Sequence, residues 1–100
     1  MMKIKDVLLR IGYARNKAHL SARELSLKMG MSSQYVAKLE GGNITLSVKK
    51  LLDILRICDF NEEKFFYENL HEYDTDHELF TLIKNLPMEK KRHLIEFLKK

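Results

Sequence analysis

A group of side chains between residues 32 and 38 has the types and spacing needed to read nucleobases. Ser32, Ser33 and Gln34 carry hydroxyl or amide groups that both donate and accept hydrogen bonds, and Lys38 follows one helical turn after Gln34. Gln34 can pair with adenine through two hydrogen bonds, and Lys38 can reach guanine acceptors or a phosphate. On an exposed helix, these side chains predict contacts with base edges in a major groove. The alternative is an ordinary solvated helix surface.

The surrounding residues predict two short helices joined by a tight turn. Ser21 and Glu24 have the spacing of a capping box, which predicts a helix over residues 21–29. Ser32 is expected to cap a second helix over residues 32–40. Gly30, between them, can adopt the left-handed conformation that a sharp reversal requires. We therefore expect the two helices to cross steeply.

Apolar residues at helical spacing predict an all-α fold along the whole chain. Further helices are expected over residues 4–17, 47–58 and 61–70. Ser47 and Asn61 are expected to cap the last two. Val48 and Leu52 are among the residues of 47–58 that we expect to face inward. An acidic linker then precedes two short helices, the first capped by Thr75 with Glu78, which form a hairpin within residues 76–99. This organisation predicts a domain at residues 1–70 and a helical extension at 71–100.

The charge of the chain is distributed unevenly. Residues 1–50 hold ten Lys/Arg and three Asp/Glu, a net charge of +7, whereas residues 51–100 hold eight and eleven, a net charge of −3. Because Lys/Arg contacts with phosphates release condensed counterions, the basic half favours a polyanionic partner. A solvated surface of mixed charge is the alternative reading of the same numbers.

Composition excludes several other classes of protein. The 100 residues suffice for a single core, and 45% of them are hydrophobic, which argues against disorder. No apolar run is long enough to cross a bilayer and no secretory signal is visible, so we expect a cytoplasmic protein without a membrane partner. Cys58 is the single cysteine, lies among apolar residues and is expected to be a buried thiol.

A set of residues from Ile11 to Phe66 carries a resemblance to a known family. It comprises Arg15, Leu20-Ser21, Glu24-Leu25, Gly30-Met31-Ser32, Tyr35-Val36, Leu39-Glu40-Gly41, Leu46-Ser47 and Leu51-Leu52-Asp53-Ile54-Leu55. In these residues the segment resembles the Cro and lambda-repressor type, or Xre-like, helix-turn-helix transcriptional regulators. The resemblance implies a five-helix domain that binds double-stranded DNA as a homodimer, with the start of the third helix in the major groove.

The resemblance also bears on the residues that would touch DNA. It implies base reading by Ser32, Ser33, Gln34 and Lys38 and a phosphate contact by Asn43. We expect the DNA backbone contacts to involve Arg15, Lys17, Arg23, Tyr35 and Asn43. Ala22 stands where the family often has a glutamine that touches phosphate, and Arg23 or Lys17 is the expected electrostatic substitute.

These observations predict a transcriptional regulator, most simply a repressor, with no enzymatic activity and no cofactor. The alternative function is that of a protein-interaction module, such as the antitoxin of a toxin–antitoxin pair. The hairpin within 76–99 is expected to serve dimerisation, with packing inside the chain or binding of a protein antagonist or toxin as alternatives. A metal site could be formed by His71, Glu72, Asp74, Asp76 and His77, but their spacing matches no compact zinc pattern. We therefore expect no metal and an acidic linker.

Overall fold

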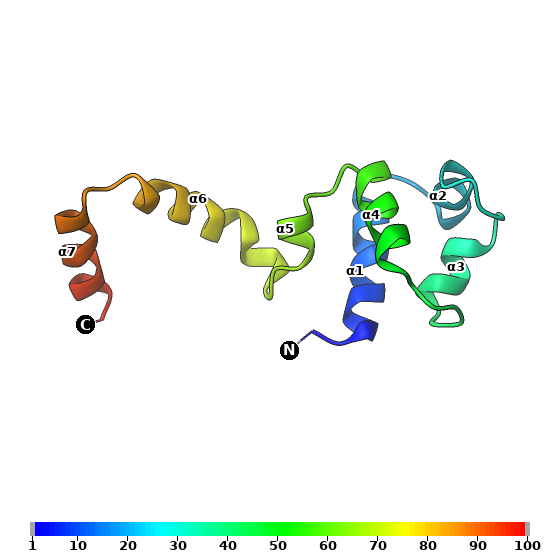
Figure 1. Cartoon of the computed structure of the whole chain (residues 1–100), viewed down its shortest axis with the longest axis horizontal. Coiled ribbons are helices and arrows are strands. Elements are labelled where there is room, and N and C mark those ends of the chain that lie inside the picture. The colour runs from blue at the N-terminus through cyan, green and yellow to red at the C-terminus, as the bar shows by residue number, and fades with distance from the viewer. Residues whose placement is uncertain (1, 100) are drawn as a thin grey trace. The chain divides into compact units, whose positions relative to one another are not determined.

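The protein is entirely helical in the computed structural model, which describes residues 2–99 (Figure 1). The helices are α1 (Ile4–Lys17), α2 (Ala22–Lys28), α3 (Tyr35–Glu40), α4 (Val48–Ile57), α5 (Glu62–Phe65), α6 (Tyr73–Lys84) and α7 (Met88–Leu98), with a short 3₁₀ helix η1 (Leu70–Glu72) before α6. The prediction of an all-α fold is confirmed. The chain divides into two compact units, Met1–Glu68 and Asn69–Lys100, whereas the sequence places the boundary after residue 70.

The first unit closes around one apolar core supplied by α1 to α5. Its fully buried members include Ile11 of α1, Leu25 of α2, Leu39 of α3, Ile54 of α4 and Phe65 of α5. Each helix therefore contributes at least one side chain to the same interior, as the periodicity of the sequence predicts. The core holds α2 and α3 in a fixed arrangement.

The inward face of α4 differs from the prediction. Val48 is 74% exposed and Leu52 is 47% exposed, while Ile54 is fully buried with Leu51 and Leu55. The expected stripe included Val48 and Leu52 and left out Ile54, and it was wrong at these positions. Spacing alone fails here because α4 has apolar residues on more than one face.

Four successive helices of the first unit end in the same way. The residue after each C-cap adopts a positive φ: His19 (60°) after α1, Gly30 (72°) after α2, Gly42 (77°) after α3 and Asp59 (51°) after α4. In each case its N–H and the next N–H donate to carbonyls of the last turn at 2.9–3.1 Å. This is the Schellman arrangement, which satisfies carbonyls that have no partner within the helix. The left-handed turn expected at Gly30 is confirmed.

Helix α5 is much shorter than the helix predicted over 61–70. It begins as expected, because Asn61 Oδ1 accepts the N–H of Lys64 at 3.0 Å, but it ends at Phe65. The guanidinium of Arg10 donates to the carbonyl oxygens of Phe65 (2.7 Å), Tyr67 and Glu68 (2.8 Å). These oxygens are the acceptors that a longer helix would use, so a distant side chain ends the helix.

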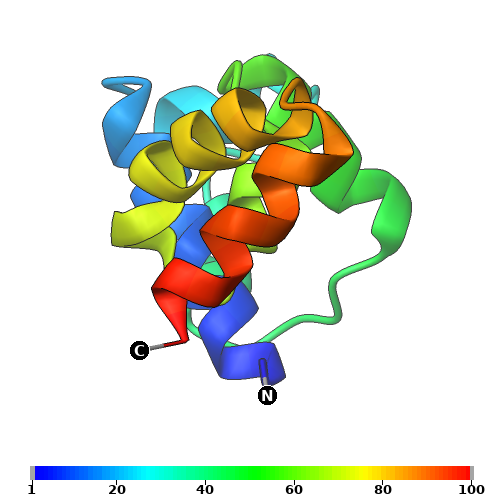
Figure 2. The ribbon, with the colours of Figure 1, turned by 90° about the vertical axis from the view of Figure 1, so that its left-hand side faces the viewer.

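The second unit consists of η1, α6 and α7. Figure 2 shows α6 and α7 as consecutive helices joined by a short turn, where Pro87 is the N-cap of α7. The predicted cap at Thr75 was wrong, because α6 begins at Tyr73 and Thr75 lies inside its first turn. In the described part of this unit Tyr73 alone is buried, so the two helices have almost no core of their own.

Candidate nucleic-acid interface

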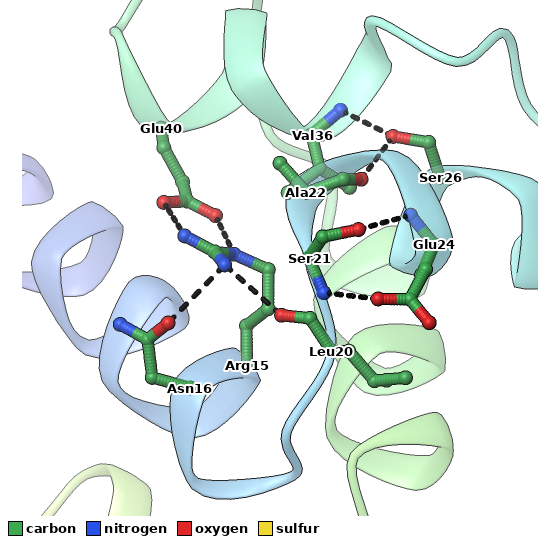
Figure 3. A network of polar contacts seen from close by, with 9 residues as sticks. All are labelled: Arg15, Asn16, Leu20, Ser21, Ala22, Glu24, Ser26, Val36 and Glu40. Atoms are coloured by element: carbon green, nitrogen blue, oxygen red, sulfur yellow. Dashed lines mark hydrogen bonds and ion pairs between the residues drawn. The ribbon is translucent and has the colours of Figure 1, made fainter.

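Helix α2 begins at the capping box that the sequence predicts. Ser21 Oγ accepts the N–H of Glu24 at 3.0 Å, and Glu24 Oε1 accepts the N–H of Ser21 at 2.9 Å (Figure 3). Both bonds favour the ionised carboxylate, so they hold the pKa of Glu24 below its ordinary value. The start of α2 is thus fixed by local hydrogen bonds.

Helix α3 begins three residues later than predicted. Its first helical residue is Tyr35 and its N-cap is Gln34, which makes no side-chain capping bond. Residues 32–35 form a turn instead, in which the N–H of Tyr35 donates to the carbonyl of Ser32 at 3.0 Å. The predicted helix start and cap at Ser32 were therefore wrong.

The cap of α3 comes from α2 instead. Ser26 is fully buried, and its Oγ accepts the N–H of Val36, in the first turn of α3, at 2.9 Å. The same hydroxyl donates to the carbonyl of Ala22 at 2.8 Å (Figure 3). One side chain thus ties the two helices together at the point where α3 starts. Ser26 was not predicted as a cap from the sequence; the signal for it was a hydroxyl beside Leu25 on the inward face of α2.

A second polar contact holds the other end of α3. Arg15 Nε lies 2.8 Å from Glu40 Oε2, and a second guanidinium nitrogen donates to Glu40 Oε1 at 3.0 Å (Figure 3). The remaining nitrogen donates to the carbonyl of Leu20 at 3.0 Å. The hydrogen bond with Glu40 raises the pKa of Arg15. A Cβ at Gly12 would lie 3.1 Å from Glu40 Oε1, so the absence of a side chain there leaves room for this close approach.

These contacts leave one face of α3 open to solvent. Gln34, Ala37 and Lys38 are exposed, whereas Val36 and Leu39 on the opposite face are fully buried. Ser32 is also exposed and Ser33 is half-buried in the preceding turn. The structure thus brings all four predicted base-reading side chains to the beginning and outer face of α3. It adds Ala37, which the sequence analysis missed and which leaves that face without bulk.

The residues predicted to contact a DNA backbone have different surroundings. Lys17, Arg23 and Asn43 are exposed and their side chains can reach a ligand. Tyr35 is half-buried, and burial raises the pKa of its phenol. Arg15 is only 16% exposed and is engaged with Glu40, so its charge is already paired inside the protein. A backbone contact by Arg15 stays a prediction.

Comparison with known proteins identifies the family. A family model described as Helix-turn-helix (HTH_3) matches residues 11–65, more than half of the chain. The chain belongs to the helix-turn-helix family. It is a DNA-binding regulator of the Cro/C1, Xre-like type, as the resemblance implies. No curated protein and no solved structure matches this helix-turn-helix chain.

Two absences hold for the part of the helix-turn-helix protein that the structure describes. No helix within residues 2–99 has the length and apolar character to cross a membrane. The same residues contain no group of three or more His, Cys, Asp or Glu side chains placed to hold a metal ion.

Proposed function

We propose that this helix-turn-helix protein is a repressor that binds a specific double-stranded DNA sequence as a homodimer. The observation that carries the proposal is the open face of α3, formed by Gln34, Ala37 and Lys38, on a helix fixed at both ends by buried or half-buried polar contacts. A helix that reads DNA must keep its outer side chains free for base contacts and its axis fixed. Both conditions are met here.

The assignment of contacts follows from exposure and chemistry. Gln34 and Lys38 have the side chains suited to hydrogen bonding with adenine and guanine, and Ala37 can contact a thymine methyl group. Ser32 and Ser33 approach bases or the adjacent backbone from the turn before α3. Lys17, Arg23, Tyr35 and Asn43 are the proposed backbone contacts.

Electrostatics supports a polyanionic ligand for the first unit. Residues 1–68 hold twelve Lys/Arg and eight Asp/Glu, a net charge of +4, whereas residues 69–100 hold six of each. The excess positive charge of the chain therefore belongs to the unit that carries α3. Affinity for DNA should fall steeply as salt rises, since each neutralised phosphate contributes a slope of about 0.9 in log K against log salt.

The first experiment selects bound sequences from random double-stranded DNA and compares them for the wild type and Gln34→Ala. We expect the wild type to select a two-fold symmetric site with half-sites about 34 Å apart. Gln34→Ala should relax the preference at one base pair of each half-site by about 1–3 kcal/mol while binding to scrambled DNA is retained. Absence of any selected sequence would favour a protein-interaction module such as an antitoxin.

The second experiment separates backbone contacts from base contacts. Lys17→Gln should weaken binding to matched and scrambled DNA alike and reduce the salt slope by about 1 per subunit. Arg56→Gln is the matched control, because Arg56 is 73% exposed at the end of α4 and takes no part in the proposed interface. An equal effect of the two substitutions would contradict the assignment of Lys17.

A further inference from the structure

The second unit exposes more apolar surface than a solvated helix pair can sustain. Seven large hydrophobic residues in the described part of this unit are 50–68% exposed: Leu79, Phe80 and Leu82 on α6, and Met88, Ile95, Phe97 and Leu98 on α7. At roughly 130 Å² each, they expose roughly 900 Å² in total over the two helices, comparable with one side of a standard interface. This surface requires a partner.

Three of these exposed residues, Phe80, Ile95 and Leu98, line a groove between the two helices. The groove has a volume of about 270 Å³ and is lined by Phe80 and Ile83 of α6, by Leu94, Ile95 and Leu98 of α7, and by Lys84 and Lys91. We call it the apolar groove. Two helices alone cannot enclose such a groove, whereas four helices can bury it as the centre of a bundle.

The charges of the same unit are self-complementary. Residues 69–84, which include α6, hold four acidic and one basic residue, a net charge of −3. Residues 85–100, which include α7, hold five basic and two acidic residues, a net charge of +3. A two-fold dimer presents the same patch twice, so it can place each α6 against the α7 of the partner and pair opposite charges at both contacts.

We propose that the apolar groove is covered by the same groove of a second copy of this chain, with α6 of each protomer packed on α7 of its partner. The assembly is a four-helix bundle formed from residues 69–100 of two chains. The inference deepens the proposed homodimer, and rests on it, by assigning the dimer interface to these two helices.

The first test measures the dimer dissociation constant of the full chain by sedimentation equilibrium. Leu98, 67% exposed, lines the apolar groove, and Leu9, 72% exposed, lies on α1 of the other unit. Leu98→Ser should raise the dissociation constant at least about tenfold, because the lost contact occurs twice in a two-fold interface. Leu9→Ser should leave it unchanged. The proposal is overturned if the wild type sediments as an 11.8 kDa monomer at high micromolar concentration, or if the two variants behave alike.

The second test exchanges charges between the helices and does not depend on removing apolar contacts. One variant carries Asp76→Lys, one turn before Phe80 on the groove face of α6, and the other carries Lys90→Glu on α7. Each variant alone should dimerise more weakly because like charges then face each other, whereas an equimolar mixture should form a heterodimer of wild-type strength. Failure of the mixture to restore dimerisation would show that α6 does not face α7 of the partner. Circular dichroism of each variant verifies that the helices are retained.

The outcomes distinguish this inference from the proposed function. A monomer that still selects a specific DNA half-site would overturn the four-helix interface and the homodimer, and would leave DNA reading by α3 intact. A stable dimer that selects no sequence would overturn the proposed function and leave the interface intact.

Discussion

Substitution of Ser26 by alanine tests how α3 is held in place. The change removes the Oγ that accepts the N–H of Val36 at 2.9 Å, in a region where both residues are fully buried. No water can replace that acceptor without entering the core, so the donor is left unsatisfied at a cost of about 1–3 kcal/mol. In the interior of α2, alanine has a more favourable helix propensity than serine by up to about 0.5 kcal/mol, which offsets part of this loss.

The net expectation for Ser26→Ala is a loss of about 1–2 kcal/mol in the free energy of unfolding. For a unit of this size, that loss corresponds to a fall in the melting temperature of about 4–15 °C. Urea denaturation followed by circular dichroism measures the free energy. Affinity for the selected DNA sequence should fall as well, because the start of α3 is no longer tied to α2.

The matched control is Ser32→Ala, in which an exposed hydroxyl is removed three residues before the helix. If Ser32 were the helix cap, as the sequence indicated, its loss would cost about 1 kcal/mol. The structure places no capping bond there, so Ser32→Ala should change stability by less than about 0.5 kcal/mol. A larger effect of Ser32→Ala than of Ser26→Ala would refute the reasoning.

Three further substitutions or measurements test the first unit. His19→Gly should raise the free energy of unfolding by about 1 kcal/mol, because a φ of 60° is unfavourable for a residue with a Cβ and not for glycine. Thermal denaturation measures the change, and an unchanged or lower stability would contradict the prediction. The pKa of Glu24, measured by NMR, should be lower in the folded protein than in an unfolded peptide. The stabilising contribution of Glu24 is present above the unfolded pKa of about 4.3 and is lost as pH falls through the folded pKa. Glu24→Gln should therefore make the free energy of unfolding less dependent on pH in this acidic range. Cys58 is 6% exposed, and burial raises the pKa of its thiol, so Cys58 should react with a thiol reagent only after the protein unfolds. Rapid labelling of the native protein would contradict this prediction and show that the core opens at Cys58.

Much of the first unit was accessible from the sequence because its signals are local. The bounds of α1, the capping box at Ser21 and Glu24, and the cap at Ser47 depend on residues within one helical turn of each other. The left-handed turn at Gly30 is equally local, since glycine has no Cβ to oppose a positive φ. These features gave the positions of α1, α2 and α4 and hence the approximate place of α3 between them.

What the sequence could not determine depends on contacts between residues far apart in the chain. The cap of α3 comes from Ser26, ten positions before Val36, and the end of α5 is set by Arg10, at least 55 positions away. The pairing of Arg15 with Glu40, 25 positions apart, likewise depends on the packing of α1 against α3. Periodicity and capping rules describe one helix at a time, whereas these hydrogen bonds exist only after α1, α2, α3 and α5 have packed. The sequence therefore determined which segment and which of its side chains are proposed to read DNA, and the tertiary structure decided where that helix begins and what holds it.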